Sequence, residues 1–172
     1  MAVATQADRV AAAWAVLADV PDPEVPAVSI RDLGIVRAVH PQADGDGLDI
    51  VLTPTYSGCP ATEAIADSVR AAIDAAGLGP ARVRLQRAPA WSSDWISPAG
   101  RDKLRAYGIA PPQHLAAGEV PVRFVRRTAT PVPCPHCGSV HTERLSAFGS
   151  TACKALHRCL DCREPFEYFK PI

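Results

Sequence analysis

The sequence carries no net charge, because its 18 basic and 18 acidic residues cancel. A neutral chain produces no overall field that would attract nucleic acid or an acidic membrane surface. Residues 123–172 are mildly basic, with eight basic and four acidic residues, but they contain no lysine- or arginine-rich run typical of a phosphate-binding arm. Acidic residues also interleave with the last aromatic ones, so we expect no nucleic-acid partner.

Long apolar runs and the usual signatures of catalysis are also missing. No apolar stretch approaches the roughly 18 residues that a membrane-spanning helix requires, so we expect no membrane insertion. The sequence contains no P-loop, no GxGxxG fingerprint, no recognisable Ser–His–Asp arrangement and no ExxH pair of the kind found in di-iron helical bundles. These absences argue against a nucleotide-binding enzyme, a serine hydrolase and a di-iron enzyme.

The beginning of the chain does not have the pattern of a secretory leader. Its alanine-rich stretch is interrupted by Asp8, Arg9 and Asp19, and it has neither a basic n-region nor a clear cleavage site, so we expect a mature helix there. The six cysteines are concentrated toward the C-terminal end, which favours intracellular metal chemistry over an extracellular disulfide framework. We therefore expect a cytoplasmic protein.

Hydrophobic periodicity predicts an α+β fold. It indicates helices at residues 6–17 and 60–76 and strands at 35–39, 48–55 and 81–88. The Asp/Gly-rich turn between the first two strands predicts an antiparallel hairpin. The order helix–strand–strand–helix–strand then gives a small α/β sandwich.

Three parts follow one another along the chain. Residues 1–90 contain the sandwich domain, and residues 91–130 contain a helix predicted at 98–107 and then a linker. Residues 131–172 form a small module that is too short to bury a sufficient core of its own. Such a module requires a metal ion or a cross-link for stability.

The strongest motif is a pair of CxxC turns, CPHC at Cys134–Cys137 and CLDC at Cys159–Cys162. The two-residue gap lets both thiolates of a tight turn face one tetrahedral ion, while backbone N–H groups of the turn bind the sulfurs. The pattern predicts a zinc-ribbon-like module with zinc as the default metal. Four thiolates can also hold an iron–sulfur cluster, and four reduced core cysteines or two disulfides are further alternatives.

Cys153 is a fifth thiol of this module and lies six residues before Cys159. A free cysteine packs well in a core, so we expect that role for it, with an alternate metal ligand or a redox partner as the other interpretations. Four cysteines already complete a site, so the nearby histidines are expected at the surface or behind the ligands. These are His136, His141 and His157.

Cys59 lies between a predicted strand and a predicted helix, in the stretch TPTYSGCPATEAI. Gly58 can open a turn there, and Pro60 suits the first helical position, where its missing N–H costs nothing. Because the N-terminal end of a helix favours a thiolate, a metal ligand or a nucleophile is a better interpretation of Cys59 than packing. A single thiol cannot hold a cluster tightly, so we expect transient or shared binding.

Several stretches resemble a known protein family. DPEVPAVSIRDLGIV, TPTYSGCP and the helix that follows resemble the small domain of SufT-like iron–sulfur maturation factors and of eukaryotic cytosolic iron–sulfur targeting proteins. PAWSSDWISPAGRDKLRAYGIAPP, CPHCGS and FGSTACKALHRCLDCREPFEYFK are similar to one branch of this family. This branch comprises the D subunits of the phenylacetyl-CoA epoxidase (ring 1,2-epoxidase) system, and the resemblance covers nearly the whole chain.

The resemblance implies an accessory component in aerobic phenylacetate catabolism. The implied partners are the other epoxidase subunits, above all the reductase, whose iron–sulfur cluster the protein would help to assemble. Cys59 matches the thiol that is expected to handle iron or a cluster transiently. Asp22 and Glu24 match the acidic motif of the family, although both also suit structural capping after the first helix. Cys59 could be shared with a client protein or across a homodimer.

Three functions are therefore compatible with the sequence. The first is assembly of a metal centre in the oxygenase or its reductase, with Cys59 as the transferring thiol. The second is a structural adaptor in the oxygenase complex, in which Cys59 only packs. The third is a thiol oxidoreductase, for which no base is recognisable beside Cys59.

Overall fold

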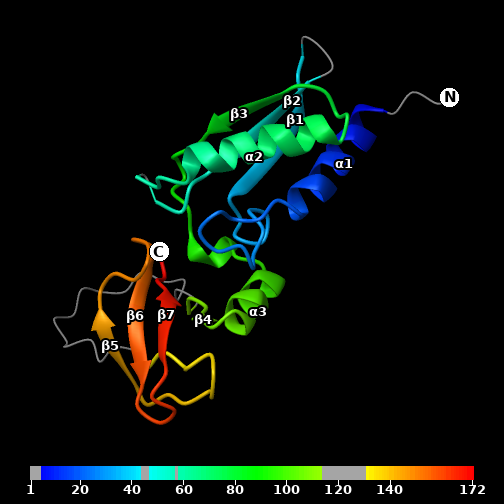
Figure 1. Cartoon of the computed structure of the whole chain (residues 1–172). Coiled ribbons are helices and arrows are strands. Elements are labelled where there is room, and N and C mark those ends of the chain that lie inside the picture. Colours follow the sequence, from blue (N-terminus) through cyan, green and yellow to red (C-terminus); the bar gives the residue numbers. More distant parts are fainter. Residues whose placement is uncertain (1–4, 44–46, 57, 114–130) are drawn as a thin grey trace, which may run out of the picture. The chain divides into compact units, whose positions relative to one another are not determined.

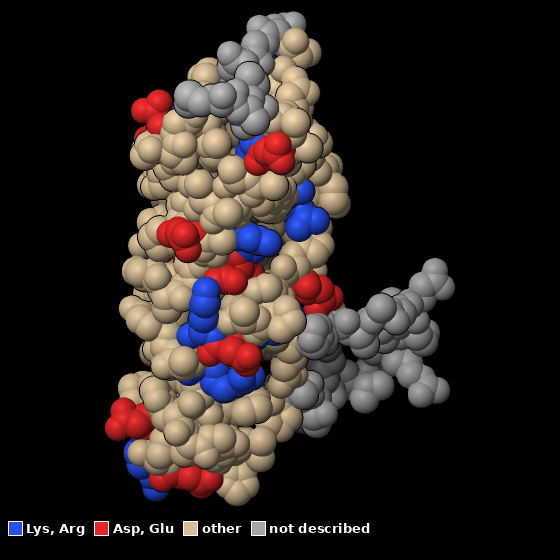
Figure 2. Space-filling model, turned by 90° about the vertical axis from the view of Figure 1, so that its right-hand side faces the viewer, with Lys and Arg blue, Asp and Glu red and all other residues tan. Residues whose placement is uncertain are grey.

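The computed structural model describes residues 5–43, 47–56, 58–113 and 131–172. The chain divides into two compact units, Met1–Gly100 and Arg101–Ile172, whose elements are labelled in Figure 1. None of the described helices is long and apolar enough to cross a membrane. On the face shown in Figure 2, basic and acidic side chains lie interspersed, without a wide area of one sign.

The first unit is a two-layer domain in which helices cover one face of a three-stranded sheet (Figure 1). Its elements are α1 (Gln6–Ala18), β1 (Val36–Pro41), β2 (Leu48–Leu52), α2 (Thr62–Ala75), β3 (Ala81–Leu85) and the 3₁₀ turn η1 (Ser93–Trp95). The strand order is β1-β2-β3, with β1 antiparallel to β2 and β2 parallel to β3. The predicted hairpin and the order helix–strand–strand–helix–strand are confirmed.

Capping and apolar spacing explain the two helices of this layer. α1 begins with a capping box, in which the Thr5 hydroxyl accepts a hydrogen bond from the Asp8 N–H and the Asp8 carboxylate accepts one from the Thr5 N–H. In α2, Ile65, Val69 and Ile73 recur at helical spacing and are almost fully buried. Each helix therefore turns an apolar stripe toward the sheet.

The loop between α1 and β1 is held by residues that follow β3. Trp91 is buried, and its Nε1–H donates to the Leu33 carbonyl at 2.9 Å. The Ser97 hydroxyl donates to the Asp32 carboxylate at 3.1 Å, and the Ser97 N–H donates to the Asp32 carbonyl at 2.8 Å. The segment after β3 thus packs on the first unit and fixes the second half of this loop.

The second unit combines α3 (Pro98–Ala106), which begins just before the boundary, with a four-stranded sheet. The strands are β4 (Ile109–Ala110), β5 (Thr142–Ser146), β6 (Lys154–Cys159) and β7 (Pro165–Phe169), in the order β4-β7-β6-β5. β4 is parallel to β7, and the other two pairs are antiparallel. The helix predicted at 98–107 is confirmed to within one residue, whereas most of the predicted linker, residues 114–130, lies outside the described residues.

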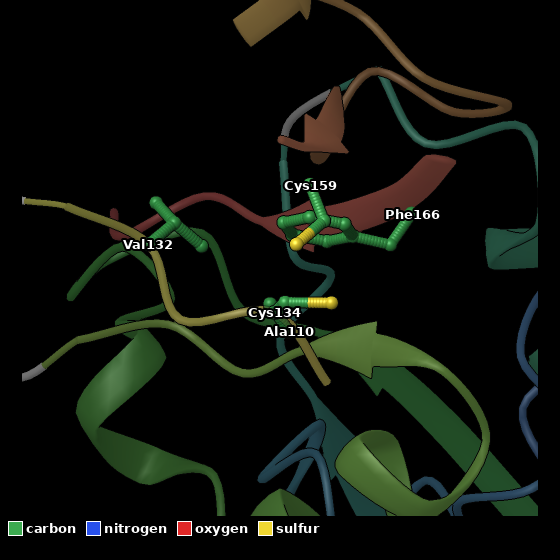
Figure 3. Packing of buried hydrophobic residues seen from close by; sticks show 5 residues of the cluster. All are labelled: Ala110, Val132, Cys134, Cys159 and Phe166. Atoms are coloured by element: carbon green, nitrogen blue, oxygen red, sulfur yellow. The ribbon is translucent and has the colours of Figure 1, made fainter. Parts of the chain in front are cut away.

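Two cysteines of the CxxC turns belong to the core of the second unit. Its hydrophobic cluster comprises Ala110, Val132, Cys134, Cys159 and Phe166, and Figure 3 shows the two cysteine side chains beside the Phe166 ring. Because the sulfurs that could bind a metal also form part of the core, folding of this unit and metal binding are coupled.

A buried ion pair joins β6 to β7 in this unit. Lys154 is only 2% exposed, and its Nζ lies 2.8 Å from Oε2 of Glu167. The Ser150 N–H donates to Glu167 at 2.6 Å. Burial raises the pKa of Glu167, but the contacts with Lys154 and Ser150 outweigh it and lower the pKa. Loss of either charge would leave the other uncompensated inside the unit.

Gly34 allows a test of how tightly the α1–β1 loop is held. Its φ is +68°, and an added Cβ would lie 2.7 Å from Cβ of Trp95, whereas Gly77 has a φ of +65° with no atom within 4 Å of such a Cβ. We expect Gly77→Ala to destabilise the protein by about 1–2 kcal/mol because of the left-handed conformation. Gly34→Ala should cost about 1–3 kcal/mol more because of crowding. Denaturant unfolding of both variants checks this, and equal losses of stability would contradict it.

Candidate metal sites

Cys59 lies in the connection between β2 and α2. Its N–H donates to the Tyr56 carbonyl at 3.2 Å, and its own carbonyl accepts from the Thr62 N–H at 3.2 Å and from the Thr62 hydroxyl at 2.8 Å. α2 begins at Thr62, with Ala61 as an N-cap that provides no side-chain hydrogen bond. The prediction that the helix starts at Pro60 is therefore wrong, because the turn closed between Cys59 and Thr62 comes before the regular helix.

The acidic motif forms a tight turn in the loop between α1 and β1. Asp22 is 6% exposed, and its Oδ1 accepts hydrogen bonds from the N–H groups of Glu24 at 3.0 Å and Val25 at 2.8 Å. The Asp22 N–H donates to the Val28 carbonyl at 2.9 Å. Asp22 therefore stabilises the turn that carries Glu24, as aspartate commonly does in such loops.

Both carboxylates act on the Cys59 thiol. Burial raises the pKa of Cys59, and the charges of Glu24 and Asp22 raise it further, whereas hydrogen bonds from the Ala61 N–H and from Thr62 lower it. The net effect is a raised pKa of Cys59. The expectation that the helix N-terminus favours a thiolate is therefore wrong here, because burial and two nearby negative charges outweigh the donors.

This electrostatic arrangement suits a metal cargo better than nucleophilic catalysis. A thiol with a raised pKa is a poor nucleophile at neutral pH. A cation would be attracted by the carboxylates of Asp22 and Glu24 and would displace the proton of Cys59. Among the residues that the structure describes, however, Cys59 belongs to no group of three potential ligands. Within the described residues, a metal bound by Cys59 would therefore lack a complete set of ligands.

The four cysteines of the CxxC turns meet in the second unit. Their sulfur atoms all lie within 4.8 Å of one another, with 3.8 Å between Cys134 and Cys162 and 3.6 Å between Cys137 and Cys159. Four sulfurs at about 2.3 Å from one tetrahedral zinc ion would be separated by about 3.8 Å, so the geometry fits this metal. All six cysteines are reduced, so the alternative of two disulfides is wrong.

The acid–base behaviour of these thiols also fits a cation site. The Cys162 N–H donates to the Cys159 sulfur at 3.5 Å and is the main reason that the pKa of Cys159 falls to about 6. The Glu164 N–H lowers the pKa of Cys162, but burial and the neighbouring sulfurs outweigh it and raise the pKa to about 12. One thiolate thus opposes the formation of the next, and a bound divalent ion would stabilise all of them.

A hydrogen bond that the sequence did not predict connects the two CxxC turns. The Ser139 hydroxyl donates to the Asp161 carboxylate, whose Oδ1 lies 3.4 Å from Nδ1 of His141. These contacts, the Ser139 hydrogen bond above all, lower the pKa of Asp161. The contact holds the two turns together. Its sequence signal was weak, because no spacing rule assigns a partner to Ser139 or Asp161.

Cys153 does not join the four ligand cysteines. It is 4% exposed, and its sulfur lies 3.0 Å from the Thr151 hydroxyl, so it is a core residue of this unit. His157 is 8% exposed, and its ring packs against Phe166 and Tyr168 at centroid distances of 5.7 and 5.4 Å. Among the described residues, no histidine joins the four sulfurs as a potential ligand.

Comparisons with known families assign both units. A family described as "Iron-sulfur cluster assembly protein" matches residues 11–84, and a family described as "PaaD zinc beta ribbon domain" matches residues 119–170. The chain therefore consists of an α+β domain of the iron–sulfur assembly type, followed by a four-cysteine zinc ribbon. This organisation is the predicted fold class.

One curated relative aligns with almost the whole chain. It is the putative D subunit of 1,2-phenylacetyl-CoA epoxidase from Escherichia coli (strain K12), and it is 51% identical over 160 residues, which are 92% of this chain and 91% of the relative. The chain belongs to the family of phenylacetyl-CoA epoxidase D subunits. The resemblance of its sequence motifs to this family is thereby confirmed.

Solved structures match part of the chain. The crystal structure of a domain of unknown function, DUF59, from Bacillus anthracis is 27% identical and covers 58% of this chain and 93% of its own, with a TM-score of 0.53. A solution structure from Mycobacterium tuberculosis, Rv1466, described as associated with [Fe-S] complex assembly and repair, is 33% identical over 62% of this chain and 92% of its own. Its TM-score is 0.36, too low to support a structural argument.

Neutralising a nearby carboxylate should lower the pKa of Cys59. We expect Glu24→Gln to shift the pH profile of Cys59 alkylation by iodoacetamide to lower pH, because one of the charges that disfavour the thiolate is removed. Glu63→Gln is the matched control, since Glu63 is an exposed acid in the first turn of α2 and is not among the main causes of the raised pKa of Cys59. Mass spectrometry of the Cys59 peptide gives the rates, and identical profiles for the two variants would contradict the assignment.

Removal of the ribbon metal should unfold the second unit and leave the first folded. A structural zinc ion contributes about 10–16 kcal/mol in zinc-finger peptides, more than so small a core supplies. We expect a strong chelator, or Cys159→Ser, to abolish the dispersed NMR amide signals of residues 131–172 while those of the first unit persist. Cys153→Ala, which removes a buried thiol outside the four-cysteine site, should keep the dispersed amide signals of both units. A second unit that stays folded without metal would disprove the coupling.

Proposed function

We propose that this protein is an accessory component of a phenylacetyl-CoA epoxidase system that assists the assembly of a metal centre, with Cys59 binding the iron or iron–sulfur cargo. The observation that carries this proposal is the position of Cys59 in the field of Glu24 and Asp22, within a domain of an iron–sulfur assembly family. The name of the relative from Escherichia coli supports the link to the epoxidase. The iron–sulfur reductase of the system is the proposed client.

Cargo transfer through Cys59 needs no redox step. When Cys59 binds iron, the thiol loses its proton and a sulfur–metal bond forms. When a ligand of the client replaces Cys59, this bond breaks and the thiol takes up a proton again. Because one sulfur and the nearby carboxylates make an incomplete ligand set, binding is weak enough for hand-over. The remaining ligands come from the client or from a second copy of the chain.

For the ribbon we propose zinc, because a closed four-thiolate site without an open position is typical of structural zinc. Iron is the alternative that four thiolates also permit. The ribbon would then stabilise the second unit and present its surface to the epoxidase subunits. We place the protein in the cytoplasm, where the six reduced cysteines would persist.

A structural adaptor without metal transfer is the second candidate function. It is favoured by the half-buried position and raised pKa of Cys59, which also describe a thiol that only packs. The same raised pKa disfavours a thiol oxidoreductase, since such enzymes rely on an accessible thiolate.

Metal analysis of an oxygen-free preparation separates these two functions. We expect the wild-type protein to contain zinc together with substoichiometric iron and sulfide, and Cys59→Ala to lose the iron and sulfide while it keeps the zinc. In cells that produce Cys59→Ala, the iron content of the purified reductase should fall. Cys153→Ala is the matched control, because it removes one thiol without touching Cys59 or the four-cysteine site.

The adaptor function would be favoured by the opposite result. A zinc-only protein that is indifferent to Cys59→Ala, in cells whose reductase is fully loaded with iron, would rule out metal transfer through Cys59.

A further inference from the structure

The outer edge of β3 has no strand partner among the described residues. β3 pairs with β2 only, at one side of the sheet (Figure 1). The Gln86 N–H donates to the Leu52 carbonyl at 2.8 Å. Backbone groups alternate between the two edges of a strand, so the N–H and C=O groups of Val83 and Leu85 point away from β2. Such an edge can pair with a strand from another molecule.

An apolar hollow adjoins this edge. It is shallow and open to solvent, and it is lined by Ile35, Leu52, Pro54, Thr62, Ile65 and Leu85. Leu85, the last residue of β3, is 48% exposed. Pro54 and Thr62 lie on either side of Cys59 in the sequence, and the Thr62 hydroxyl donates to the Cys59 carbonyl at 2.8 Å. The hollow therefore borders the loop that carries Cys59.

Positive charge accompanies the same edge on the other face of the sheet. The guanidinium groups of Arg82 and Arg84 lie 3.9 and 2.5 Å from the Asp49 carboxylate, and their side chains are 63% and 58% exposed. One carboxylate thus faces two arginines, so this group of side chains has an excess of one positive charge. Charged residues on an edge strand often serve only to prevent aggregation. Leu85 does not fit that explanation, because an exposed leucine beside an apolar hollow favours association.

We propose that the outer edge of β3 binds an extended segment of the client protein in which acidic and apolar side chains alternate. The segment would add a strand to the sheet. Its apolar side chains would contact Leu85 and the hollow, and its acidic side chains would face Arg82 and Arg84. The identity of the client rests on the proposed function. A second copy of the chain is a poor occupant, since two β3 strands side by side would place arginines opposite arginines.

Docking at this edge would bring the client next to Cys59, the thiol from which it would receive the metal. The hollow lies at the end of β3 next to the Cys59 loop. A client segment bound there holds its own metal ligands near Cys59, which lacks enough partners within the described chain to retain a metal. The binding energy would therefore come from the edge and the hollow, while Cys59 itself stays a weak ligand.

Charge reversal at the edge tests the proposal. The full-length protein is titrated with the purified reductase, and separately with each purified oxygenase component, at low and moderate salt. We expect one of these proteins to bind, and Arg84→Glu to weaken that binding about tenfold at low salt. Arg70→Glu is the matched control, because Arg70 also pairs with an aspartate, Asp67 at 2.6 Å, but lies on α2. It should bind as the wild type does.

Val83→Pro tests the backbone pairing. Proline removes the outward N–H without removing a hydrogen bond to β2, so we expect this variant to lose binding while its thermal unfolding midpoint stays close to that of the wild type. If Val83→Pro unfolds the domain, Arg84→Glu alone decides, since it leaves the backbone unchanged. Absence of binding by every epoxidase component, or wild-type affinity of Arg84→Glu, would overturn the proposal. A wild-type dimer that Val83→Pro dissociates would overturn it as well.

The two proposals fail in different ways. Cys59→Ala should retain docking and lose client loading. If Arg84→Glu binds and loads the client normally while Cys59→Ala does not, the docking proposal falls and the assembly function stands. If Cys59→Ala loads the client normally while Arg84→Glu weakens binding, the docking edge stands and metal transfer through Cys59 falls.

Discussion

The parallel pairing of β2 with β3 is the constraint on which the first unit depends. Parallel neighbours cannot be joined by a tight turn, so the chain must cross over the sheet between them, and α2 is this crossover. The crossover starts where β2 ends, next to the end of β3. Cys59 therefore lies in the loop that leaves the end of the central strand as a result of topology, and the apolar hollow lined by Leu52, Thr62 and Leu85 adjoins the same end of the sheet.

The two cysteine sites solve the same electrostatic problem in different ways. In the ribbon, four sulfurs within 4.8 Å disfavour one another as thiolates and together form a complete shell for one ion. At Cys59 a single sulfur is disfavoured as a thiolate by burial and by the charges of Glu24 and Asp22, and these two carboxylates are themselves attractive to a cation. The first arrangement retains a metal, whereas the second gains only part of a coordination shell. Under the proposed function, retention and exchange of a metal would thus be separated into two units of one chain.

Local signals in the sequence predicted most of the fold and the ribbon ligands. The apolar stripe of α1, the β1–β2 hairpin and the CxxC turns each depend on the spacing of a few residues. Pro60 misled the prediction of α2, because proline fits a turn as well as a first helical position. The predicted direction of the Cys59 pKa shift was also wrong, since it depends on burial and on the charges of Glu24 and Asp22, which lie in a distant part of the sequence. The hydrogen bond from Trp91 to the Leu33 carbonyl could not be predicted from the sequence either, because it depends on tertiary packing.

The strand order of the ribbon has a consequence for protein synthesis. β7 lies between β4 and β6, although it is the last of the four described strands of this sheet to be made. The first unit can fold as soon as residues 1–100 have left the ribosome, since N-terminal domains generally fold first. The ribbon sheet cannot close until Phe169 has been translated. A stalled or shortened chain would lack β7, one of the two inner strands of this sheet, so only a chain translated through β7 can enclose the four sulfurs in a folded ribbon.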